Sequence, residues 1–129
     1  MASVFSDERA FGRIFAPDET WLVRAEPEPA LDRELPIVDA HHHLWDMPAQ
    51  RYLLPKFAAH LASGHNVRAS VFVNCYAAYR TTGPLEMRPV GEVEFAAAIA
   101  AASQCGSYGP CRVAAAIVGL LIVTLTPGA

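Results

Sequence analysis

The chain has 129 residues, of which 53% are hydrophobic and 18% charged, a balance that excludes an intrinsically disordered chain and leaves room for one domain at most. Its 13 acidic and 10 basic side chains give a net charge of -3 without any block of like charge, which argues against a nucleic-acid-binding surface. The three cysteines contain no Cys-x-x-Cys pair, so we expect no disulfide framework or zinc ribbon, but buried, reduced thiols in a cytoplasmic protein.

Residues 1–35 are predicted to form an irregular N-terminal arm. Prolines stand at positions 17, 27, 29 and 36, two of them inside an acidic stretch, "RAEPEPALDREL", that suits exposed chain. The first residues mix acids and bases and lack the apolar run of a signal peptide, so we expect no export. The organised part then begins with Ile37–His41, which reads as a short strand buried on both faces.

The segments that follow alternate between helical and strand patterns. A short helix is predicted from Pro55 to Ala62, because proline favours a first helical position, and the apolar run Val67–Cys75 is predicted as a strand. The alanine-rich stretch Gly91–Gly106 carries two acids in its first turn and is predicted as a helix, with a third strand following over residues 112–119. This order predicts an α/β fold with three parallel strands and intervening helices.

The most apolar part of the chain is Val113–Leu125, "VAAAIVGLLIVTL". At 13 residues it is shorter than the roughly 20 that a membrane-spanning helix needs, so we expect one or two buried strands, with a membrane anchor as the minor alternative. Self-association through this apolar C-terminus is the expected interaction with another protein chain.

Three consecutive histidines stand in "PIVDAHHHLWD". Side chains alternate along a regular strand, so Asp39, His41 and His43 are predicted to share one face, with His42 on the other. His41 and His43, with α-carbons about 7 Å apart, can converge on one divalent cation such as zinc or manganese. Asp39 is a candidate further ligand or an acceptor for a ligand's N–H.

The spacing alone leaves a structural reading open, since isolated histidine pairs also occur as hydrogen-bonded features without metal. Two histidines do not complete a catalytic site, which normally has three protein ligands and an open position. His60 and His65 are expected to be solvated or capping groups, and Trp45 is expected to pack or to wall a pocket.

The motif "VDAHHHLWD" resembles the Asp-x-His-x-His opening of the amidohydrolase-related family of metal-dependent hydrolases. Three later blocks, "SGHNVRASVFVNCYAAYR", "GPLEMRPVGEVEF" and "GPCRVAAAIVG", are similar to consecutive blocks of one bacterial branch. The resemblance implies a (β/α)₈ TIM barrel of which residues 36–119 form the N-terminal part. It also implies that His41 and His43 are metal ligands, that Asp39 matches the motif's leading acid, and that metal-activated water attacks an amide, lactone or similar carbonyl of a small molecule.

The chain departs from the family pattern in three ways. It has about half of the ~250 residues of a typical barrel, so the later ligands and the acid/base carboxylate have no counterpart and no catalytic residue is assigned. Asn74 stands where relatives carry a carboxylate. Residues 120–129 replace a His-Ala-Asp continuation with "LLIVTLTPGA".

The divergent tail suggests a frameshift, because loss of one nucleotide from His-Ala-Asp codons can yield Leu-Leu-Ile. A gene with no family pattern in the alternative frame would contradict this hypothesis. The resulting expectation is a truncated relative of amidohydrolases that is inactive alone. The alternative is a small non-catalytic metal-binding or oligomeric interaction module that uses Asp39, His41 and His43 and associates through the apolar tail.

Overall fold

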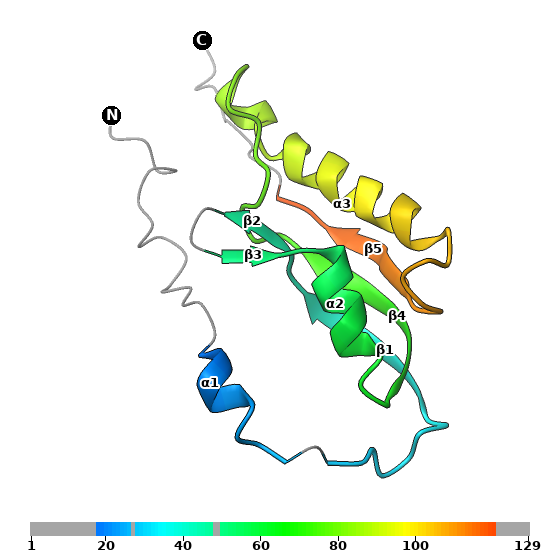
Figure 1. The fold of residues 1–129 in the computed structure, drawn as a ribbon. Coiled ribbons are helices and arrows are strands. Elements are labelled where there is room, and N and C mark those ends of the chain that lie inside the picture. The colour runs from blue at the N-terminus through cyan, green and yellow to red at the C-terminus, as the bar shows by residue number, and fades with distance from the viewer. Residues whose placement is uncertain (1–17, 27, 48–49, 121–129) are drawn as a thin grey trace.

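The computed structural model describes residues 18–26, 28–47 and 50–120. It contains a three-stranded sheet in the order β1-β4-β5, with β1 at Pro36–His42, β4 at Asn66–Val73 and β5 at Arg112–Val118 (Figure 1). Both pairs of neighbouring strands are parallel, which confirms the predicted α/β class. The predictions for residues 1–17 and 121–129 lie outside the described residues.

The elements between the strands include both predicted helices. The helix α2 (Leu54–Leu61) precedes β4, and α3 (Val90–Ser103) follows the 3-10 helix η2 (Leu85–Met87) and precedes β5. An antiparallel hairpin of β2 (Trp45–Met47) and β3 (Gln50–Tyr52), which was not predicted, follows β1 directly.

The arm before β1 contains one short helix, α1 (Glu19–Leu22), where irregular chain was expected. Asp18 caps it, because its carboxylate accepts the backbone N–H groups of Thr20 and Trp21. None of its residues is buried. The helix α1 is therefore a locally capped turn of chain that adds no side chain to the core.

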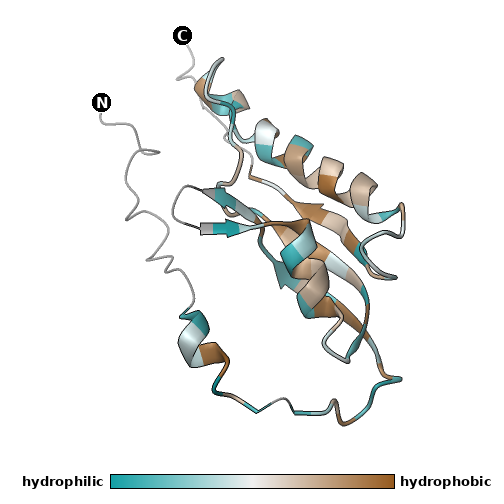
Figure 2. Cartoon of the chain, viewed as in Figure 1, coloured by the Kyte–Doolittle hydropathy of each residue, from teal (hydrophilic) through white to brown (hydrophobic). Residues whose placement is uncertain are grey.

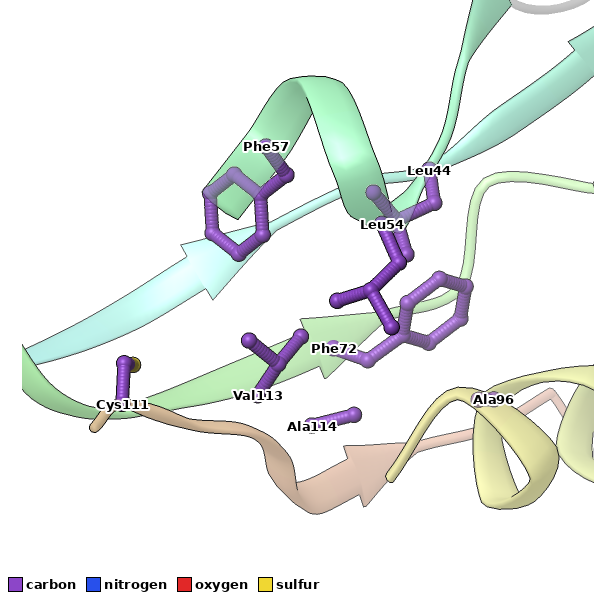
Figure 3. Packing of buried hydrophobic residues seen from close by; sticks show 8 residues of the cluster. All are labelled: Leu44, Leu54, Phe57, Phe72, Ala96, Cys111, Val113 and Ala114. Atoms are coloured by element: carbon purple, nitrogen blue, oxygen red, sulfur yellow. The ribbon is translucent and has the colours of Figure 1, made fainter. Parts of the chain in front are cut away.

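The core lies between one face of the sheet and the two longer helices. Leu54 and Phe57 from α2 and Ala96 from α3 pack against Phe72 and Val113 of the sheet (Figure 3). The brown, apolar segments gather on the strands and on the neighbouring helices, whereas the β2–β3 hairpin is largely hydrophilic (Figure 2). Burial of these side chains supplies the main driving force for the fold.

The opposite face of the sheet is not covered by these helices. Val38 pairs with Ala69 and Val73 pairs with Val118, and paired residues of parallel strands point to the same face. Val38 is 63% exposed and Val118 is 52% exposed. The expectation that β1 is buried on both faces is therefore wrong, because α2 and α3 pack only on the other face.

The last strand contains a bulge that was not expected from its continuous apolar sequence. Between the pairs Ala69–Arg112 and Val71–Ala116 the register of β5 shifts, and Ala114 takes a φ of 52°. The backbone N–H of Ala114 donates to the buried Ser70 hydroxyl at 3.2 Å. This buried hydroxyl satisfies a main-chain donor that the ladder leaves unpaired.

The cysteines do not share one environment. Cys111 is buried, Cys75 is half-buried and Cys105 is exposed, so the expectation of three buried thiols is wrong for Cys105. Cys105 follows the end of α3, where the chain turns back toward β5 at the surface.

Of the apolar C-terminal run, β5 confirms one predicted strand, but the expected burial is wrong for Ala115, Ala116 and Val118, which are exposed, the last two of them on the face that the helices leave uncovered. Within the described ranges, no helix combines the length and the apolar character that crossing a membrane requires.

Candidate metal centre

A bulge in β1 determines where the histidines point. Asp39 pairs with Ser70 and His42 with Phe72, so two residues of β1, Ala40 and His41, stand opposite one residue of β4. Asp39 and His42 consequently lie on the helix-covered face together with their partners. The regular alternation expected from the sequence, with Asp39 beside His41 and His43, is wrong because the bulge reverses the side-chain direction after Asp39.

The bulge brings the imidazoles of His41 and His43 together. Their Nε2 atoms lie 3.0 Å apart, and the ring planes meet nearly at right angles, at 89°. The Nδ1 of His43 lies 2.9 Å from the carbonyl oxygen of Val73 at the end of β4. A carbonyl only accepts, so this Nδ1 carries the proton and the Nε2 of the neutral His43 ring presents its lone pair.

These two donors have the geometry of a partial metal centre. Zinc–nitrogen bonds of about 2.0–2.1 Å in a tetrahedral site place two imidazole nitrogens about 3.3–3.4 Å apart, close to the spacing found here. The Val73 carbonyl supplies the outer hydrogen bond that histidine ligands of metals commonly make. Without metal, the Nε2–H of His41 donates to the Nε2 of His43. His41 is exposed and His43 half-buried, so a cation can reach the pair from solvent.

Asp39 is not brought to the pair. Its carboxylate accepts the backbone N–H of His41 at 3.1 Å, a donor that the bulge leaves without a ladder partner. Burial, and after it the Asp39 charge, raises the pKa of Tyr52 and of Cys111, which belong to or pack against the core. Over the described part of the chain, no group of three or more His, Cys, Asp or Glu side chains is arranged to hold a metal ion.

His42 points away from the pair, as expected, and is buried between two aromatic rings. It stacks on Phe57 with ring centroids 4.5 Å apart and meets the edge of Phe72 at 5.7 Å. Neither ring nitrogen makes a hydrogen bond of normal geometry to the described residues. Burial lowers the pKa of His42, against the opposing effects of the Asp39 charge and the Val71 backbone.

Replacing His42 with phenylalanine is expected to stabilise the fold by about 1–2 kcal/mol, because it removes two buried nitrogens that make no hydrogen bond of normal geometry. The change should also reduce acid sensitivity. The pKa of His42 is lowered in the folded state, so its neutral form favours folding above the unfolded pKa of about 6.5, and this contribution is lost as the pH falls below that value. Urea denaturation between pH 7.5 and 5 in metal-free buffer measures both effects.

All other titrating groups are common to the wild type and the His42→Phe variant. The difference between their stability curves therefore isolates His42. A difference that stays constant across this pH range would contradict the assignment of a neutral, buried ring.

Beside the pair, a buried acid organises the loop that follows β4. Glu92, in the first turn of α3, accepts the backbone N–H groups of Cys75 and Ala77, each at 2.9 Å, and the side-chain amide of Asn74. The sequence indicated only a helix-dipole role for this residue. Burial and the Glu92 charge raise the pKa of Cys75 to about 12, which keeps this thiol protonated and unreactive.

Of the other side chains considered from the sequence, His60 and Trp45 make structural contacts. The Nδ1 of His60 lies 2.7 Å from the Tyr52 hydroxyl, and His65 is exposed before β4. The indole of Trp45 lies beside His43 with ring centroids 5.4 Å apart, so it packs against one of the two candidate ligands.

Comparisons with protein families, with curated proteins and with solved structures each gave no significant match. The resemblance to amidohydrolases therefore rests on the sequence motif and its neighbouring blocks, and the activity it implies stays a prediction.

Proposed function

We propose that this chain forms the first three strands of a barrel hydrolase related to the amidohydrolase family, and that His41 and His43 bind a divalent cation such as zinc or manganese. One observation carries the proposal: two Nε2 atoms 3.0 Å apart, one of them oriented by a hydrogen bond from its own ring to the Val73 carbonyl. This arrangement supports the proposal because it fits two adjacent ligands of one ion.

The topology supports the barrel part of the proposal. Three parallel strands lie side by side in chain order, the helices pack on one face, and the candidate ligands stand at the carboxyl end of β1. In a (β/α)₈ barrel the helices cover the outside and the site lies at the carboxyl ends of the strands. The bare face with Val38 and Val118 corresponds in this proposal to the barrel interior.

A bound cation would lower the pKa of a coordinated water to about 7 and polarise the carbonyl of an amide or lactone substrate. The residues described here would contribute binding and orientation: His43 through its fixed ring and His41 through its exposed one. The general acid/base carboxylate and the remaining metal ligands of a hydrolase would come from residues other than His41 and His43. These two histidines thus support cation binding more directly than they support a complete hydrolytic reaction.

The test is a titration of the purified chain with zinc, in which calorimetry measures the binding. Metal analysis after gel filtration then measures how much zinc stays bound. The His41→Ala/His43→Ala double variant should bind zinc at least about 100-fold more weakly, because loss of ligating groups removes the coordinate bonds. In the wild type, free zinc at about 100 times its dissociation constant should add about 2.7 kcal/mol to the unfolding free energy.

The matched control is His65→Ala, which removes an exposed imidazole on the same chain. It should leave zinc binding and thermal stability unchanged. Equal zinc affinity in the double variant and the wild type would refute the assignment of His41 and His43.

A second function, a non-catalytic metal-binding or interaction module, is favoured by the absence of a third donor near the pair in the described ranges. Zinc-loaded protein that hydrolyses neither simple amides nor lactones would support this module. Measurable turnover that disappears in the double variant would support the hydrolase.

A further inference from the structure

The candidate centre has two donor atoms from the protein, which is fewer than stable zinc sites have. Structural zinc sites are almost always four-coordinate, and catalytic ones normally have three protein ligands. In the described segments, His41 and His43 have no third His, Cys, Asp or Glu beside them that completes a metal site. A tightly held ion therefore needs donors from another source.

The position of the pair favours donors from a second chain. In the part of the chain that the structure describes, β1 is an edge strand of the sheet, with β4 as its one neighbour (Figure 1). The core with α2 and α3 lies on the face that His42 enters, so these helices do not stand over the pair. Of the two imidazoles in the pair, that of His41 is the more exposed to solvent.

We propose that one divalent cation is shared by two copies of this chain, each supplying the Nε2 atoms of His41 and His43. The inference rests on the proposed function, because it requires that the pair binds metal, and it names the partner that completes the site. In a two-fold symmetric association the same patch of both copies meets, so two ligands become four without any further residue.

The geometry and the charge both suit such sharing. Two Nε2 atoms separated by 3.0 Å occupy one edge of a small coordination polyhedron, and the second copy supplies the opposite edge. Four neutral imidazoles leave the ion its full positive charge. Each chain carries a formal net charge of -3, so a dication at the symmetry axis reduces the repulsion between the copies.

The experiment follows the mass of the full chain by sedimentation equilibrium while zinc is added, in parallel with calorimetry. The expected result is a dimer that forms as zinc is added, with a breakpoint at half an ion per chain, and that chelation returns to monomer. Cobalt in place of zinc should give the intense visible absorption of tetrahedral coordination, which a six-coordinate surface ion lacks.

The outcomes separate this inference from the function on which it rests. A breakpoint at one ion per chain, in monomers or in dimers holding two ions, would overturn the sharing and leave metal binding intact. No zinc binding would overturn both. The single variants His41→Ala and His43→Ala should each lose the zinc-induced dimer, whereas His65→Ala should retain it, and circular dichroism checks that each variant is folded.

Discussion

Replacing Glu92 with alanine is expected to lower the free energy of unfolding by about 3–5 kcal/mol. The carboxylate accepts two backbone N–H groups and the Asn74 amide in a buried environment. Alanine would leave the donors of Cys75 and Ala77 unpaired in the protein interior. Urea denaturation followed by circular dichroism measures the loss.

A second acid on the same helix provides the control. Glu94 is exposed and pairs with Arg80 at the surface, and exposed ion pairs contribute about 0–1 kcal/mol. Glu94→Ala should therefore unfold near the wild-type midpoint. If Glu92→Ala did so as well, the buried network around the loop after β4 would not be a stabilising element of the fold.

The role of Glu92 extends to the candidate centre. It fixes the main chain from Cys75 to Ala77, immediately after the Val73 carbonyl that orients the His43 ring. The Sγ of Cys75 lies 3.6 Å from the carbonyl oxygen of Leu44, so the ends of β1 and β4 are linked twice. The buried carboxylate thus orders the loop that begins next to the contact between His43 and the Val73 carbonyl.

The alternation of strands and helices could be predicted because each segment carries a local signal. Val67–Cys75 is rich in β-branched and aromatic residues, and the alanine-rich helix has acids at its start. The β2–β3 hairpin was missed because its sequence has no Asn-Gly or Asp-Gly turn. Local propensity therefore gave the parallel sheet and its helices but not the short connection between them.

The candidate pair could be predicted from its spacing, but the position of Asp39 could not. A period of two assumes a regular strand, whereas the bulge inserts an additional residue and is visible only in the pairing with β4. The role of Glu92 was equally hidden, because its partners are main-chain groups 15 or more residues earlier in the chain. Long-range pairing, not composition, determines both.

Replacing Phe72 with alanine is the second large effect, with an expected loss of about 3–5 kcal/mol. Phe72 is 1% exposed and stands at the centre of the core, with the rings of His42 and Phe95 at centroid distances of 5.7 and 6.4 Å. Alanine removes most of this apolar surface and leaves a cavity between the sheet and the helices. Thermal and urea unfolding measure the loss. The Phe72→Leu variant fills part of the space, so its free energy of unfolding should lie between those of the wild type and Phe72→Ala.

The neighbouring Val71 tests whether only one face of the sheet is a core. Its side chain belongs to the opposite, bare face, since it pairs with the exposed Ala116. Val71→Ala should therefore lower stability by no more than about 1 kcal/mol, because it creates no enclosed cavity. A loss as large as that of Phe72→Ala would show that this face is covered in solution, and a loss that appears only at higher protein concentration would assign the cover to a second copy of the chain.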